Sequence, residues 1–140
     1  MGKINIGRVV LGGLLAGVVL NIGEFVLNVA LLEEQWKAAM ESLNLAQVGD
    51  AAIVWFNVWG IVMGIAIVWT YAAMRPRFGA GPKTAIIVGL AVWFMLWVLG
   101  FGSSIIMGLY PTNLVLISLV WGLFEVPIAT VAGAWLYKEQ

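Results

Sequence analysis

Four long apolar stretches follow one another along the chain, separated by short polar breaks. They cover residues 7–32, 51–74, 85–109 and 114–137. A helix needs about 20 mostly apolar residues to cross the hydrocarbon core of a bilayer, and each stretch is long enough. Only "YPTN" separates the last two, so these must turn back on each other. The pattern predicts an all-α fold, an antiparallel four-helix transmembrane bundle in a single domain over residues 1–140.

The first break has a helical pattern of its own. Its apolar positions recur at helical spacing, and its charged positions lie four apart on another face. The apolar positions are Trp36, Ala39, Met40 and Leu43, and the charged ones are Glu33, Lys37 and Glu41. We expect an amphipathic helix on the outer surface of the membrane, either as a fixed cap over the bundle or as a mobile lid over a site.

The composition excludes several classes of function. Hydrophobic residues make up 63% of the chain and charged residues 10%, which is typical of an integral membrane protein. The formal net charge is zero, so nothing indicates a nucleic-acid partner. Cys and His are both absent, which removes the commonest ligands of zinc, haem and iron–sulfur clusters. We therefore expect no cofactor, and since no nucleophile stands out, no enzyme.

The basic residues predict the orientation. Six lie before or at the start of the first stretch, in the second break or after the last stretch: Lys3, Arg8, Arg75, Arg77, Lys83 and Lys138. Lys37 alone lies on the other side. Because short loops rich in Lys and Arg stay in the cytoplasm, we expect both termini to be cytoplasmic, in a bacterial inner membrane. The break at 75–83 is a topology signal first and a contact for anionic lipids second.

Small and polar residues form a stripe on the face of each span. The stripes are Gly13, Gly17, Asn21, Glu24 and Asn28 on the first span, Asn57, Gly60 and Gly64 on the second, Gly89, Trp93, Leu96, Gly100 and Ser103 or Ser104 on the third, and Ser118, Gly122, Glu125, Ala129 and Gly133 on the fourth. Small residues at this spacing let helices approach closely in lipid. We therefore expect the stripes to face one another inside the bundle.

Glu24 and Glu125 are the candidate functional residues. Every Lys and Arg lies in or beside a break, so neither carboxyl has an obvious cationic partner within the membrane. Each must be protonated, hydrated or bound to a cation, because an isolated buried carboxylate is very costly. Which cation, if any, stays open. The alternative is a purely structural role, in which both side chains form ordinary hydrogen bonds between helices.

Other polar residues are expected to complete a pocket biased toward the outside. They are Asn21, Asn28, Asn57 and Ser118. Pro127 should kink the last span, because it lacks an N–H and its ring clashes with the carbonyl at position 123. A freed carbonyl beside Glu125 is an element that coordinates ions in discontinuous transporter helices, although a tolerated kink is the simpler interpretation.

Two functions of different classes follow. The first is binding or passage of protons, cations or a small solute through this intramembrane pocket. The second is a non-catalytic accessory or assembly subunit of a larger membrane complex, with the deep side chains Trp93, Trp97 and Trp121 packed against it. Four spans enclose little volume, so either function favours a homo-oligomer or a larger complex as well as contact with the lipid bilayer.

Four segments resemble those of small bacterial four-span integral membrane proteins of uncharacterised function. The segments are "LAGVVLNIGEFVLN", "QWKAAMESL", "RPRFGAGPKTA" and "FEVPIATVAGAWLY". The resemblance covers most of the chain and implies the same four-span fold, but it brings no activity and no site residue. The motifs of small multidrug transporters and of fluoride channels are not recognisable.

Overall fold

Helices make up all the regular structure of the molecule. The computed structural model describes residues 2–139, and no strand occurs within that range. Four helical stretches are long and apolar enough to cross a membrane: Ile6–Leu31, Asp50–Phe78, Pro82–Ile106 and Thr112–Leu136. The prediction of an all-α chain with four apolar candidate spans is confirmed.

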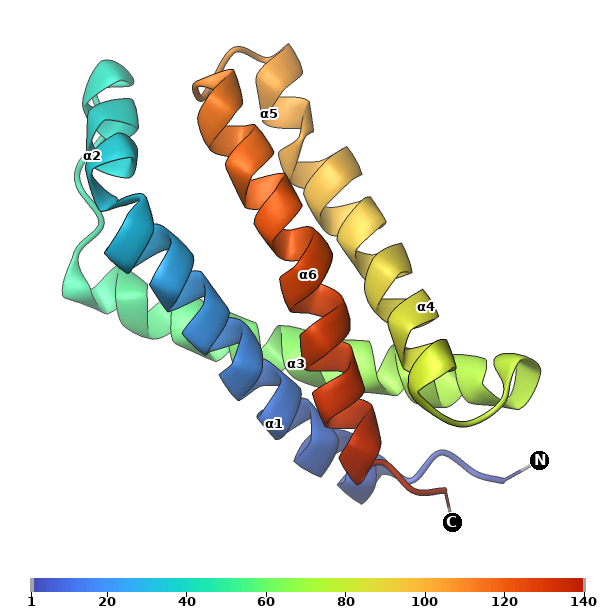
Figure 1. Cartoon of the computed structure of the whole chain (residues 1–140). Coiled ribbons are helices and arrows are strands. Elements are labelled where there is room, and N and C mark those ends of the chain that lie inside the picture. Colours follow the sequence, from blue (N-terminus) through green and yellow to red (C-terminus); the bar gives the residue numbers. More distant parts are fainter. Residues whose placement is uncertain (1, 140) are drawn as a thin grey trace.

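Two of the four spans change their hydrogen bonding partway (Figure 1). The first span is α1 (Ile6–Phe25) continued by the π-helical segment η1 (Val26–Leu31), and the third is α4 (Pro82–Trp93) continued by the π-helical segment η2 (Phe94–Phe101) and the short α5 (Ser103–Ile106). The other two are α3 (Asp50–Phe78) and α6 (Thr112–Leu136), and α2 (Glu33–Ser42) follows η1. A π-helix bonds each residue to the fifth one along, so it widens the turn and often marks a functional site.

The inner break is shorter than the sequence predicts. α3 continues through Pro76 to Phe78, four residues beyond the expected end at 74, and leaves only Gly79–Gly81 as a connection. Proline near the end of a helix removes a single hydrogen bond, so the last turn survives it. Gly79 then ends the helix with a φ of 87°, a conformation that glycine adopts without strain.

Glycines bring α1 and α3 into direct backbone contact. A methyl group on Gly17 would lie 2.7 Å from the Cα atom of Ile61, and one on Gly64 would lie 2.7 Å from the Cα atom of Gly17. A methyl group on Gly13 would overlap the backbone of Ile65. The two predicted small-residue stripes therefore meet, and their lack of side chains permits the close crossing.

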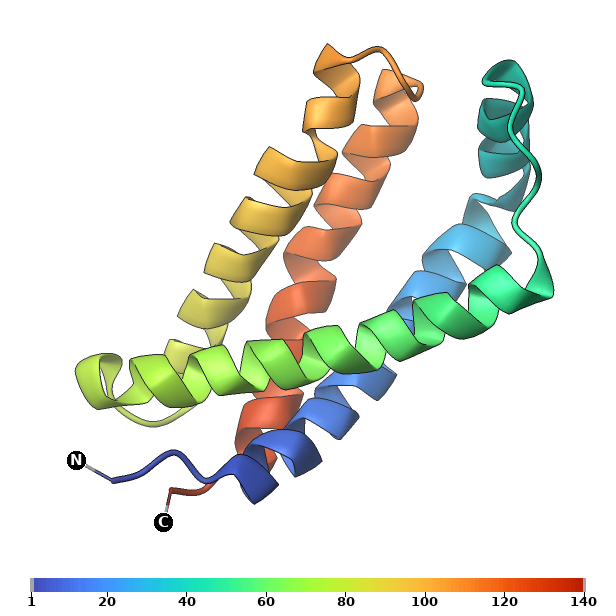
Figure 2. The same ribbon diagram turned by 180° about the vertical axis from the view of Figure 1, so that it is seen from behind.

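α6 is the most deeply buried of the four apolar helices. Half of the residues in its most apolar segment are buried, a larger share than in the other three. It contacts α1 where Gly12 faces the carbonyl of Gly133, and α4 where a methyl group on Gly89 would lie 2.5 Å from the Cα atom of Pro127. Figures 1 and 2 show α4 and α6 side by side and antiparallel, while α3 crosses the other spans obliquely.

The predicted stripe of the third span is wrong at Leu96 and Gly100, which are exposed, whereas Ser104 is buried as expected. Leu96 is exposed, and Trp97 instead packs against Gly122 of α6. The cause is the π-helical segment η2, because its wider turn moves the buried face along by one residue. Trp93 keeps its expected place, and its indole N–H donates to the carbonyl of Leu119 over 2.8 Å.

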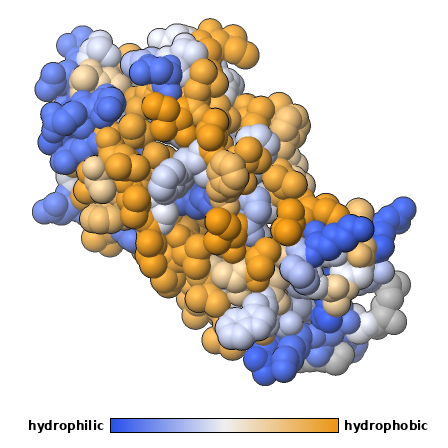
Figure 3. Space-filling model, in the orientation of Figure 1, coloured by the Kyte–Doolittle hydropathy of each residue, from blue (hydrophilic) through white to orange (hydrophobic). Residues whose placement is uncertain are grey.

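The break after the first span forms the helix α2. Ala39 is buried and Trp36 packs beside it, whereas Lys37 is exposed with its ammonium 3.0 Å from Glu33 and 3.3 Å from Glu34. Hydrogen bonds to these two carboxylates, with Glu33 the larger cause, raise the pKa of Lys37 above its ordinary value. Figure 3 shows hydrophilic residues gathered at two opposite ends of the molecule, with an apolar band between them.

Candidate functional site: a carboxyl pair between α1 and α6

The structure brings together the two carboxyl groups that the sequence singles out. Glu24 lies one residue before the end of α1 and Glu125 lies midway along α6, and the carboxyl group of Glu24 is a close neighbour of that of Glu125. Two ionised carboxylates cannot donate to each other, so a hydrogen bond between them would require a proton on one of them. The fold therefore places two carboxyl groups side by side from helices that are distant in the sequence.

A chain of hydrogen bonds extends from Glu24 toward α2. The side-chain amide of Asn28 donates to the Oε2 atom of Glu24 over 2.6 Å and to the backbone carbonyl of Glu24 over 3.0 Å. The indole N–H of Trp36 donates to Oδ1 of Asn28 over 2.8 Å. Asn28 is thus oriented by Trp36, and it keeps one oxygen of Glu24 occupied.

Aromatic side chains surround the Trp36 end of this chain. The ring of Trp36 meets the ring of Tyr110 edge-on at 5.4 Å between centroids, and Phe101 lies 6.3 Å from Trp36 and 6.0 Å from Tyr110. These three rings come from α2, from η2 and from the connection before α6. By packing on one another, the three rings hold α2, η2 and the connection before α6 together beside Asn28.

Glu125 is the more secluded of the two carboxyl groups. The residue is 7% exposed, and both of its carboxyl oxygens are shielded from solvent and accept no hydrogen bond from any donor within residues 2–139. The indole N–H of Trp121 lies beside this carboxyl and is likewise buried without an acceptor in that range. Unpaired buried polar atoms are rare in native proteins and point to exchangeable protons, bound water or ions.

The predicted asparagine pair of α1 and α3 forms a separate contact. Asn21 donates from its side chain to the backbone carbonyl of Asn57 over 3.0 Å, and Asn57 donates to the carbonyl of Ile53 over 2.8 Å. Ser118 bonds within its own helix, to the carbonyl of Leu114 over 3.1 Å. Among the described residues, none of these three side chains hydrogen-bonds to either carboxyl group, so the expected single pocket divides into parts.

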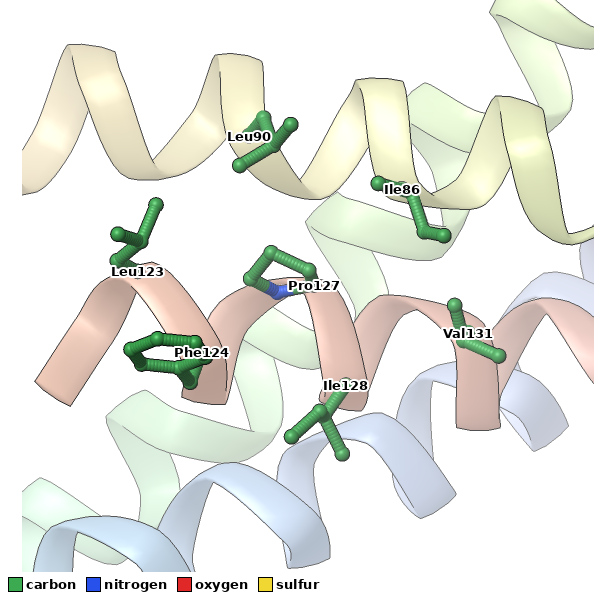
Figure 4. A pocket seen from close by; sticks show the side chains of 7 residues that line it. All are labelled: Ile86, Leu90, Leu123, Phe124, Pro127, Ile128 and Val131. Atoms are coloured by element: carbon green, nitrogen blue, oxygen red, sulfur yellow. The ribbon is translucent and has the colours of Figure 1, made fainter.

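Pro127 lies on the opposite side of α6 from the carboxyl pair. α6 is continuous through this residue, and the kink stays a prediction. Figure 4 shows Pro127 in an apolar groove between α4 and α6, with a volume of about 530 Å³. The groove is lined by Ile86, Leu90, Leu123, Phe124, Pro127, Ile128 and Val131. Its apolar lining fits contact with lipid chains.

Three residues of the site were missed by the sequence analysis as site residues. Trp36 and Trp121 were assigned to packing, because nothing in their spacing shows which donor meets which acceptor across helices. Gly23 lies beside the carboxyl of Glu125, yet it falls one position off the stripe through Asn21 and Glu24. The glycine directly before Glu24 was the available signal for a close approach.

The polar side-chain groups described at this site are two carboxyl groups, the amide of Asn28 and the indole N–H of Trp121. Within residues 2–139 there is no cluster of three or more His, Cys, Asp or Glu side chains that could hold a metal ion. Two carboxyl groups and an amide can bind and release a proton, or bind a small cation between them. No family model, no curated protein and no solved structure matches the chain.

Proposed function

We propose that this chain is an integral membrane protein whose carboxyl pair, Glu24 and Glu125, binds protons or small cations and passes them, or a small solute with them, across the bilayer. One observation carries the proposal, the burial of both Glu125 oxygens beside a second carboxyl group. Within residues 2–139 neither side chain forms an ion pair with Lys or Arg. Asn28 positions Glu24 through its hydrogen bond.

Energetics favours this function over a purely structural role. A hydrogen bond between membrane helices contributes only about 0.6 kcal/mol on average, and a neutral residue provides the same packing at lower cost. An ionised carboxylate without a partner is very costly in hydrocarbon, so the pair is stable there only while it holds a proton or a cation. Ionisable residues within membrane spans mark ion and proton pathways for this reason.

The same proposal includes a topology. The four spans form an antiparallel bundle in a bacterial inner membrane, with both termini in the cytoplasm and α2 lying at the outer surface. The position of six of the seven Lys and Arg residues supports this orientation. The backbone N–H of Asn5 donates to the hydroxyl of Tyr137 over 3.4 Å, which supports a common side for the two ends of the chain.

Proton flux in vesicles tests the function. The purified protein is reconstituted in liposomes that contain a pH-sensitive dye, and a potassium diffusion potential with valinomycin drives protons inward. We expect the wild-type protein to acidify the lumen. Glu24→Gln and Glu125→Gln should lower the rate to that of protein-free vesicles, because an amide keeps the size of the carboxyl group but cannot release a proton.

Glu41→Gln is the matched control. Glu41 is an exposed glutamate at the far end of α2, so its loss should leave the rate unchanged. Equal proton-flux rates for wild-type protein and Glu125→Gln would contradict proton passage through the carboxyl pair, as would a wild-type rate no higher than that of empty vesicles.

A second candidate function rests on a different surface. The first half of α3 exposes large apolar side chains, and the polar side chain of Asn57 is exposed among them. An exposed amide in a membrane span indicates a neighbouring polar group, so this half of α3 favours contact with a second copy or a larger complex. An accessory subunit would show no flux alone and would remain bound to its complex in mild detergent.

A further inference from the structure

The carboxyl group of Glu125 rests directly on the backbone of α1 at Gly23. A methyl group at position 23 would overlap the Oε1 atom of Glu125, and it would stand 2.8 Å from Cδ and 3.1 Å from Cγ. Real side chains essentially never approach within 3.0 Å in this way. The absence of a side chain at Gly23 therefore makes the space that the carboxyl of Glu125 fills.

This contact differs from the other close glycine contacts of α1. Gly12, Gly13 and Gly17 meet backbone atoms of neighbouring helices, so they determine how closely the helices pack. The atoms that a methyl group at Gly23 would meet belong to the side chain of Glu125. Because this side chain can change its rotamer, a substitution at Gly23 should move the carboxyl group more than it separates the helices.

Glu24 is the titratable group that faces Glu125, and it comes from α1. The charged residues of the other neighbouring helices lie near the helix ends: Asp50, Arg75 and Arg77 on α3 and Lys83 on α4. η2 contributes no charged residue. The protonation of Glu125 therefore depends on its position relative to one partner, and Gly23 fixes that position.

We infer that Gly23 is a positioning residue that holds the carboxyl of Glu125 against α1, so that Glu24 and Glu125 share a single proton. The inference rests on the proposed function and narrows the bound species to a proton. A carboxyl group that packs on bare backbone and faces a second carboxyl needs only a proton between the two to complete a hydrogen bond. Gly23 touches neither carboxyl group through a side chain of its own, and acts through Glu125.

Infrared difference titration of the protein in lipid tests the inference. The band of the protonated carboxyl is followed with pH, and the coupling is the change in the proton affinity of Glu125 caused by Glu24→Gln. We expect a change of at least about tenfold in the wild-type background, the threshold for interacting sites. In the Gly23→Ala background we expect less than about twofold, because the displaced carboxyl no longer shares its proton.

Gly7→Ala is the matched control, since Gly7 is a helical glycine of α1 whose methyl group would meet only Asn5, at 3.5 Å. It should retain the full coupling. Undiminished coupling in Gly23→Ala would overturn the inference and leave the proposed function intact, because that function depends on the flux lost in the two Glu→Gln variants. A flux-inactive wild-type protein with normal coupling would reject the function and not the positioning.

A second pair of variants covers the case in which Gly23→Ala fails to fold. The double variant Gly23→Ala with Glu125→Ala removes the three atoms that the new methyl group would meet. If this double variant folds where Gly23→Ala does not, the clash with Glu125 is established, which supports the positioning role of Gly23. If neither folds while Glu125→Ala alone does, Gly23 is required by another contact and the inference is wrong.

Discussion

At the scale of single residues, the site depends on a few donors placed opposite a few acceptors. Asn28 connects Glu24 to Trp36, so one side chain joins the membrane span to the helix that follows it. Glu125 has no comparable donor within the described residues. The two carboxyl groups are therefore inequivalent: one is oriented by an amide and the other by packing against Gly23.

Trp36→Phe removes one donor from this chain. The variant keeps an aromatic ring against Tyr110 but leaves Oδ1 of Asn28 without its hydrogen bond of 2.8 Å. We expect the free energy of unfolding to fall by about 0.6 kcal/mol, the average for such hydrogen bonds in a membrane protein. Reversible unfolding in mixed micelles, followed by circular dichroism, measures the loss.

Trp135→Phe provides the comparison, because Trp135 is 78% exposed on the last helix. It should leave the free energy of unfolding nearly unchanged. If both variants unfold alike, the indole N–H of Trp36 makes no net contribution to stability.

At the scale of helices, the glycine contacts of α1 and α3 determine how the spans cross. A methyl group on Gly64 would overlap the carbonyl of Gly13 and the amide nitrogen of Gly17, which are backbone atoms that cannot rotate away. The crossing therefore tolerates no added volume, unlike contacts between flexible side chains.

Gly64→Ala should destabilise the protein by forcing α1 and α3 apart. We expect a loss of about 1–3 kcal/mol in the free energy of unfolding, the usual cost of overpacking. The same micelle experiment measures it, with Gly7→Ala as a helical glycine that has room for a methyl group. A Gly64→Ala protein as stable as Gly7→Ala would mean that the two helices do not touch at this point.

The sequence predicts some of these contacts and not others, for identifiable reasons. Gly13, Gly17, Gly60 and Gly64 follow a four-residue spacing that itself reports a shared face, so their meeting was predictable. The site contacts of Gly23 and Trp36 depend on which helices become neighbours, which the order of the spans leaves open. Trp97 and not Leu96 contacts α6 because the segment η2 is π-helical. A prediction from periodicity assumes uniform α-helical turns, so it cannot anticipate this shift.

At the scale of the whole molecule, the two ends of the chain lie together. Figure 1 shows both termini at the same end of the molecule, where Asn5 and Tyr137 are hydrogen-bonded. Arg75, at the end of α3, is at this end too, because its guanidinium lies 5.6 Å from the ring centre of Tyr137. A single membrane orientation therefore places all these groups on one side.

Single cysteines test the proposed orientation, and the natural chain contains none to interfere. We expect Lys3→Cys and Lys138→Cys to be protected from a membrane-impermeant maleimide in intact bacterial cells, because both lie on the positively charged side. Ala46→Cys, at an exposed position between α2 and α3, should react in the same cells. Permeabilised cells provide the control in which all three react, and labelling of the terminal cysteines in intact cells would reverse the orientation.

The pairing of the first span with the last has a consequence for biosynthesis. Glu24 and Glu125 are about 100 residues apart in the sequence, and ribosomes add about 5–20 residues per second. Glu125 is therefore synthesised about 5–20 s after Glu24. During that interval Glu24 has Asn28 as a hydrogen-bond partner but lacks its second carboxyl group. The carboxyl pair is therefore complete only once α6 has been made, and a chain truncated before α6 would leave Glu24 without its carboxyl partner.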